Sequence, residues 1–129
     1  DYAIKHTNFV NGNPYLADVC IAGCDGASAQ WRTILIGGLN GGGRGYYALD
    51  VTNPTSPVML WEFTAENDSS LGYTFGEPVV TKLGSGANAG KWVVLLTSGY
   101  NNGSLDNDGV TSNAPVGNGQ GYLYVLDAY

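Results

Sequence analysis

The sequence predicts an all-β fold, and three observations carry that prediction. Aromatic and β-branched residues dominate the apolar runs, which is typical of strands. Glycine and asparagine interrupt these runs about every 8–12 residues, and no helical period is present. The segment 31–50 also occurs a second time as 92–127, and each copy has a Trp-led apolar run, a Gly/Asn-rich connection and a Gly-Tyr strand ending in Leu-Asp. Self-similarity of this kind indicates a repeat architecture.

The Trp-led runs do not alternate apolar with polar residues. Ile34 and Ile36 point to one side of the first run and Leu35 to the other, so both faces of this strand are expected to be buried. Since the chain lacks helical patterns, the covering layers must be other sheets, as in a β-propeller. We expect about two blades, each a four-stranded antiparallel sheet, in an incomplete ring, because whole propellers use about 4–8 blades.

The first blade is expected over about residues 15–64. A short strand follows the turn formers of the first fourteen residues, the Trp-led run is β-branched, the next strand carries a tyrosine pair, and the last has Trp61 and Phe63 on one face. Asp50 and Pro54 fix the reversal before that last strand. The four expected strands are 15–21, 31–37, 45–51 and 58–64.

The second blade is expected over about residues 73–129, with its last strand missing. Its strands are 73–83, 91–99 and 121–127, by analogy with the first copy. Pro78 has no N–H to donate, so it belongs at the strand start or at a bulge. The two blades together make one unit over residues 1–129. The chain opens without an initiator Met or a signal peptide, which we interpret as a mature or excised piece of something longer.

Composition excludes several classes of function. The chain has 129 residues, a formal net charge of −6 and only five basic residues. No basic patch is available to replace counterions on a phosphate backbone, so nucleic acid is not an expected partner. Anionic membrane surfaces are disfavoured for the same reason. No apolar run of about 18 residues occurs, so no transmembrane segment is expected.

Cys20 and Cys24 form a C-x3-C pair. Zinc would need two more ligands, and the only histidine is His6. The remaining readings are a small-loop disulfide and two buried thiols. We favour the disulfide, which in so short a loop stabilises by about 2 kcal/mol. A disulfide would indicate an oxidising compartment, the periplasm or the cell exterior.

The two copies differ most in one connection. The first uses residues 38–44, whereas the second uses 101–120, and a connection that long is usually functional or disordered. We therefore expect a partner-binding surface there, with candidate contacts at Asn101, Asn102, Asp106 and Asp108. Arg44, in the shorter connection, is a further candidate contact, although a surface arginine paired with a carboxylate is the simpler reading.

Asp106, Asp108 and Gly109 fit the third, fifth and sixth positions of a calcium loop. The first position would be Ser104 and the twelfth falls on Pro115, so the bidentate glutamate is absent. The alternatives are a weak calcium site at Asp106 and Asp108 and a solvated loop. Calcium is thus a possible cofactor, and no other cofactor is indicated.

No enzyme signature is present. The G-x-G-x-x-A match at 43–48 precedes a Tyr-rich strand instead of the helix that a dinucleotide site needs, so it is read as a tight turn. One histidine does not support a Ser-His-Asp site. Acidic residues that could act as paired carboxylates have no fixed separation, and they are Glu62, Glu66, Asp68 and Glu77.

Five blocks in order resemble the C-terminal propeller of the PilY family: WRTILIGGLNGGGRGYYALDVTNP, LWEF, LGYTFGEPVV, KWVVLLTSGYNN and GQGYLYVLDA. The resemblance implies a secreted protein at the tip of type IV pili, or at the outer-membrane surface after export through the periplasm. It implies roles in pilus assembly, retraction control, adhesion and twitching motility. Implied partners are minor pilins and a host or abiotic surface. The family's calcium site lies in an Asp-rich blade loop, and Asp106 to Gly109 is the nearest stretch here.

Two other functions stay open. The Leu-Asp strand endings also resemble quinoprotein dehydrogenase propellers, but that class commonly uses adjacent cysteines, whereas Cys20 and Cys24 are separated. A glycan-binding propeller would stack Trp or Tyr on sugar, and it ranks last because Trp31, Trp61 and Trp92 are interpreted as core. The leading expectation is a non-enzymatic pilus-tip module.

Overall fold

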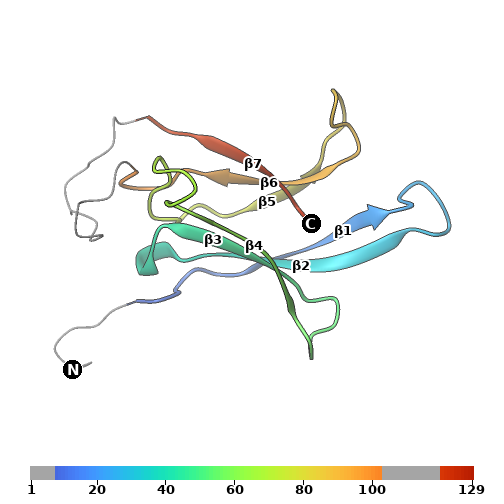
Figure 1. Cartoon of the computed structure of the whole chain (residues 1–129), viewed down its shortest axis with the longest axis horizontal. Helices are drawn as coiled ribbons and strands as arrows, with labels where there is room; N and C mark the ends of the chain where they lie inside the picture. The colour runs from blue at the N-terminus through green and yellow to red at the C-terminus, as the bar shows by residue number, and fades with distance from the viewer. Residues whose placement is uncertain (1–7, 103–119) are drawn as a thin grey trace.

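A computed structural model describes residues 8–102 and 120–129 of the chain. Within these residues, seven strands form two antiparallel sheets, one lying over the other (Figure 1). The first sheet has the order β1-β2-β3-β4, and its strands are β1 (Tyr15–Ala22), β2 (Gln30–Gly38), β3 (Gly45–Asp50) and β4 (Val58–Thr64). The second has the order β5-β6-β7, with β5 (Val79–Lys82), β6 (Trp92–Thr97) and β7 (Leu123–Asp127). The all-β prediction is confirmed.

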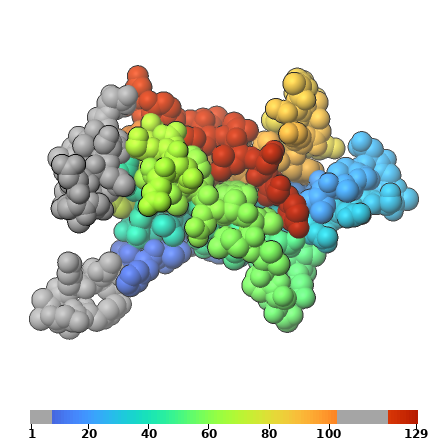
Figure 2. Space-filling view, in the orientation of Figure 1, coloured from blue at the N-terminus to red at the C-terminus, as the bar shows by residue number. Residues whose placement is uncertain are grey.

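Short connections join β1 to β2, β2 to β3, β3 to β4 and β5 to β6. A single turn of 3-10 helix, η1 (Asn40–Gly42), lies between β2 and β3. The β1–β2 turn and the β5–β6 turn project from the same end of the molecule, as light blue and gold lobes in Figure 2. Among the described residues, no helix has the length and apolar character needed to cross a membrane.

The hydrophobic core lies between the sheets. Ile34 and Ile36 of β2 are completely buried, and they join Val94 and Leu96 of β6 in one cluster. Trp61 and Phe63 of β4 pack against that cluster, as the sequence predicted for one face of this strand. On the opposite side of β2, Leu35 is only half-buried. The expectation that both faces of this strand are covered therefore holds fully for one face only.

The predicted strand 73–83 was too long. Of residues 73–83, only those of β5 form a ladder with β6, and upstream of β5 an isolated bridge joins Tyr73 to Tyr100. Between these points the chain bonds to the first sheet instead: the Thr74 hydroxyl donates to the Gly45 carbonyl at 2.8 Å, and the Gly76 carbonyl accepts from the Tyr46 hydroxyl at 3.1 Å. Hydrogen bonds between the sheets thus replace the ladder, and the strand begins after Pro78, which cannot donate.

The prediction that all three tryptophans belong to the core was wrong for Trp31. Trp61 and Trp92 pack against the core cluster, whereas Trp31 is 51% exposed. Its ring forms a T-shaped pair with that of Trp92, with ring centroids 6.0 Å apart. Trp31 and Trp92 occupy corresponding places in the repeat, but of the two Trp92 is the one that packs against the core cluster.

Candidate functional site

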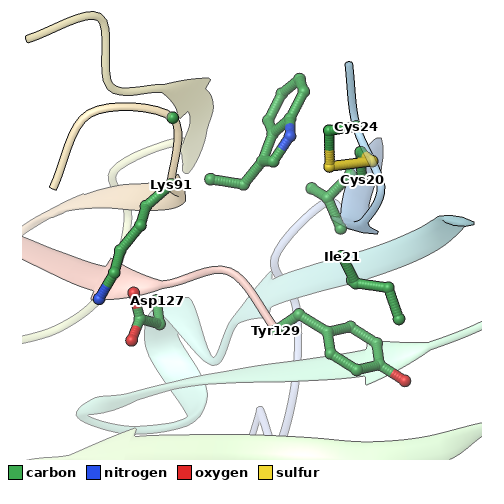
Figure 3. Close-up of a pocket in the computed structure, with 9 residues that line it drawn as sticks. Cys20, Ile21, Cys24, Lys91, Asp127 and Tyr129 are labelled. Carbon is green, nitrogen blue, oxygen red and sulfur yellow. A yellow bond between two sulfur atoms is a disulfide. The ribbon is translucent and has the colours of Figure 1, made fainter. Parts of the chain in front are cut away.

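A pocket of about 340 Å³ lies where the end of β1, the start of β6 and the C-terminal residues meet. We call it the junction pocket (Figure 3). A volume of this size is at the lower end of the range for small-ligand sites. Its lining combines apolar, charged and aromatic side chains from both sheets: Val19, Cys20, Ile21, Cys24, Gly90, Lys91, Trp92, Asp127 and Tyr129.

A disulfide forms one wall of the junction pocket. Cys20 and Cys24 are joined, with their Cα atoms 5.7 Å apart, and Cys20 is buried. Gly23 closes the small loop between them at a φ of 61°, a left-handed conformation that glycine adopts without steric cost. Figure 3 shows the disulfide beside Ile21, with Lys91 and Asp127 on the other side of the cavity. This arrangement can bind an apolar group flanked by polar atoms, and its cysteines offer no free thiolate as nucleophile.

The C-terminal residues attach the second sheet to the first. The Tyr129 hydroxyl donates to Asp50 Oδ2 at 3.0 Å, and Arg32 Nε lies 3.7 Å from the same oxygen. The pKa of the Asp50 carboxyl is lowered, mainly by the Thr52 hydroxyl and further by its backbone N–H and the Tyr129 hydroxyl. The Ala128 N–H donates to the Trp92 carbonyl at 3.0 Å. The bond from Tyr129 thus joins the C-terminal residues to the first sheet, and the bond from Ala128 continues the pairing of β7 with β6.

Arg44 is buried, so the prediction of a surface arginine that contacts a partner was wrong. Its side chain donates from Nε to the Leu71 carbonyl at 2.6 Å and from Nη2 to the Ser69 carbonyl at 2.9 Å. The residue is only 8% exposed, and desolvation lowers the pKa of the guanidinium. Arg44 therefore fixes the segment that leads from the first sheet to the second.

The described ends of the long connection are held close together. Asn102 Nδ2 donates to the Gln120 carbonyl at 2.8 Å, and the Tyr122 hydroxyl donates to Gln120 Oε1 at 2.7 Å. Behind them, Ser98 and Tyr122 exchange two hydrogen bonds, Ser98 N to Tyr122 O at 2.9 Å and Tyr122 N to Ser98 Oγ at 3.0 Å. Asn101 precedes this clamp at a φ of 54°. Asn101 and Asn102 thus lie at the base of the predicted partner-binding loop, whereas Asp106 and Asp108 fall outside the described residues.

The acidic residues singled out from the sequence occupy turn and surface positions. Asp68 accepts from the Ser70 N–H at 2.8 Å, as a turn residue does, while Glu62, Glu66 and Glu77 are exposed. Burial raises the pKa of Tyr124 to about 12, and the nearby Asp68 carboxylate adds to this shift. In residues 8–102 and 120–129, no group of three or more His, Cys, Asp or Glu side chains could hold a metal ion.

Sequence reasoning missed the junction pocket. Lys91, Asp127 and Tyr129 come from different parts of the second copy, and they meet β1 only after the sheets stack. The cysteine pair was the one local signal of this site. Its neighbours depend on how the two sheets are placed, which no local pattern specifies.

Comparisons of the sequence and the fold with known proteins all identify relatives of one family. The family profile described as the PilY1 beta-propeller domain matches residues 2–127. The type IV pilus biogenesis factor PilY1 of Pseudomonas aeruginosa strain UCBPP-PA14 is 46% identical over 103 residues, which cover 80% of this chain and 8% of the relative. A PilY1 homolog of Xylella fastidiosa is 37% identical over 100 residues, which cover 75% of this chain and 6% of the relative.

A solved structure is also similar. The crystal structure of the Pseudomonas aeruginosa PilY1 C-terminal domain superposes with a TM-score of 0.66 and 34% identity. The match covers 92% of this chain and 19% of that chain. The chain therefore spans less than a tenth of the two curated relatives and about a fifth of the solved domain.

Proposed function

Because this chain belongs to the PilY1 β-propeller family, we propose that it acts within a type IV pilus biogenesis factor as a non-enzymatic module. The observation that carries this proposal is the family match, which runs over residues 2–127 and includes both sheets. The two stacked sheets supply a rigid support, since their shared core is completely buried. In this role the module supports pilus assembly and retraction control, and with them adhesion and twitching motility.

We assign the contact with partners to the connection 101–120. Its support is geometric: the clamp of Asn102, Gln120 and Tyr122 closes the base of the connection on the sheet. A long segment anchored at both ends presents its side chains at low entropic cost compared with a free tail. The partners proposed are minor pilins at the pilus tip and a host or abiotic surface.

The proposed location is extracellular, at the pilus tip or the outer-membrane surface, after passage through the periplasm. The Cys20–Cys24 disulfide supports this location, because disulfides form and persist in oxidising compartments. Calcium binding at Asp106 and Asp108 stays a prediction from the sequence.

Genetic replacement tests the role. In-frame removal of the codons for this chain should reduce surface pili, attachment and the twitching zone. A second strain replaces 101–120 by the shorter connection 38–44 of the first copy and should keep the protein at the surface while losing attachment. As a matched control, Ser85→Asn with Ala87→Asn alters an exposed turn and should behave as wild type. Normal piliation, attachment and twitching in the deletion strain would refute the proposal.

Two biochemical assays distinguish the proposed function from the quinoprotein and glycan-binding alternatives. A quinoprotein would show quinone absorbance and dye-linked alcohol oxidation in the purified protein. A glycan-binding module would give signals on a glycan array that disappear in a Trp31→Ala variant, since Trp31 is the tryptophan that the fold leaves 51% exposed. We expect neither result.

A further inference from the structure

The junction pocket is apolar on one side and charged on the other. The Cys20–Cys24 disulfide and Ile21 form the apolar side, and Lys91 and Asp127 lie on the opposite side, with their charged ends toward the same end of the view in Figure 3. The lining of one cavity therefore combines a hydrophobic wall with one positive and one negative side chain.

Lys91 differs from the other basic residues in the described part of the chain. Arg44 donates to two backbone carbonyls, and Arg32 and Lys82 lie 3.7 and 3.8 Å from an aspartate. Within residues 8–102 and 120–129, the Lys91 ammonium and the Asp127 carboxylate form no ion pair or side-chain hydrogen bond, either with each other or with another group. Both charges of the junction pocket are thus available to a ligand.

The backbone fixes the positions from which these two side chains extend. Asp127 is the register partner of Val93 in the β6–β7 ladder, so it lies close to the start of β6. Lys91 directly precedes β6, and its carbonyl accepts from the Leu83 N–H at 2.9 Å. A ligand therefore has to order only side chains, and not the backbone, when it binds, which lowers the entropic cost of binding.

We propose that the junction pocket binds a free α-amino acid whose side chain is aliphatic or aromatic. In such a molecule the ammonium and the carboxylate are attached to one carbon atom, and the apolar side chain extends from that carbon in another direction. The ligand ammonium pairs with Asp127 and the ligand carboxylate with Lys91. The ligand side chain packs on the disulfide and Ile21, where it is removed from water.

The charges of the protein favour a zwitterion over a simple ion. The chain has a formal net charge of −6, which repels a simple anion from Lys91. A simple cation would pair with Asp127 but leave Lys91 without a partner. A zwitterion has no net charge and pairs with both groups. The volume of about 340 Å³, at the lower end of the range for small-ligand sites, suits a single amino acid better than a longer peptide.

Titration of the 129-residue chain with leucine, followed by heteronuclear NMR, tests the proposal. For so small a ligand we expect a Kd of about 1 mM, so the titration should extend to about 20 mM in a buffer of physiological salt. The signals that shift should include the Trp92 indole N–H and the backbone N–H groups of Ile21 and Lys91. The absence of a saturable shift in these signals overturns the proposal.

Three analogues of leucine test which groups are recognised, and they need no variant of the protein. Leucinamide lacks the carboxylate and N-acetylleucine lacks the ammonium, so each should bind about threefold or more weakly than leucine. In ε-aminocaproate the two charges are at opposite ends of the molecule, and it should bind more weakly as well. Equal affinity for leucine and ε-aminocaproate would show that the two charges are not recognised together, and the proposal would fail.

Two variants assign the charges to residues. Lys91→Gln should weaken leucine about threefold or more and abolish the preference for leucine over leucinamide, and Asp127→Asn should abolish the preference over N-acetylleucine. Lys82→Gln and Glu62→Gln remove the same charges from positions outside the pocket and should bind leucine like the unaltered chain. The NMR spectrum of each variant shows whether it is folded.

The remaining outcomes are also decisive. Unchanged ligand preferences in both pocket variants would place the ligand elsewhere and overturn the proposal. An equal loss in Lys82→Gln and Lys91→Gln would do the same, because the loss would then follow from net charge and not from the pocket. The junction pocket is separate from the connection 101–120, so this proposal and the proposed partner contact succeed or fail independently.

Discussion

Substitution of Arg44 by methionine should destabilise the protein strongly, although the sequence suggested a surface residue. Methionine keeps an apolar stem of similar length but leaves the Leu71 and Ser69 carbonyls without the donors at 2.6 and 2.9 Å. A hydrogen bond from a charged group contributes about 1.5–3 kcal/mol, and a buried acceptor left unpaired costs a similar amount. The bond to Leu71 is buried and the bond to Ser69 only partly so, and together they give an expected loss of about 2–4 kcal/mol.

Urea unfolding followed by tryptophan fluorescence measures this loss. With a slope of about 1–3 kcal/mol per molar, the midpoint should fall by roughly 1–4 M. Arg32→Met is the matched control, because its contact with Asp50 is long, at 3.7 Å, and partly exposed, and such pairs contribute less than about 1 kcal/mol. Equal midpoints for the two variants would refute the assignment of Arg44 as the residue that fixes the inter-sheet segment.

Three further predictions concern redox state, pH and calcium. Reduction of the Cys20–Cys24 disulfide should lower the unfolding free energy by about 2 kcal/mol, and urea melts with and without dithiothreitol measure it; an unchanged midpoint would contradict this. The pKa of Tyr124 is raised from 10.0 to about 12, so its stabilising contribution is complete below pH 10 and is lost as the pH rises through 12. The unfolding free energy of Tyr124→Phe should not show this fall at alkaline pH. Identical pH profiles for the variant and the unaltered protein would refute the prediction. Calcium titration calorimetry should show weak binding that Asp106→Asn with Asp108→Asn removes, and heat that survives the double substitution would place the ion elsewhere.

The strand pattern could be predicted because it depends on local chemistry. β-Branched and aromatic runs between glycine and asparagine turns favour strands whatever lies around them. All four strands of the first sheet were expected within one or two residues of their observed ends. The strand before Val79 was overestimated, because Thr74 and Gly76 bond to the first sheet, and that competition is not visible in the local sequence.

Arg44 and Trp31 show why side-chain environment was harder to predict. An arginine in a glycine-rich turn is usually exposed, and only the path of residues 69–71 beneath it provides the carbonyls that make burial possible. A tryptophan at the start of an apolar strand is usually covered, and whether it is covered depends on which side of its sheet has a neighbour. Both errors concern which surfaces meet, and neither concerns the conformation of the strand itself.

The sequence by itself determined the repeat, the strands, the turn positions and the family, because each is encoded in residue order over short spans. Only the tertiary structure decided which face of each sheet is core, where the cysteine pair lies relative to Lys91 and Asp127, and which arginine is buried. These features depend on the stacking of two similar sheets. Since both sheets carry apolar residues on both faces, hydrophobicity alone does not tell the inner face from the outer one.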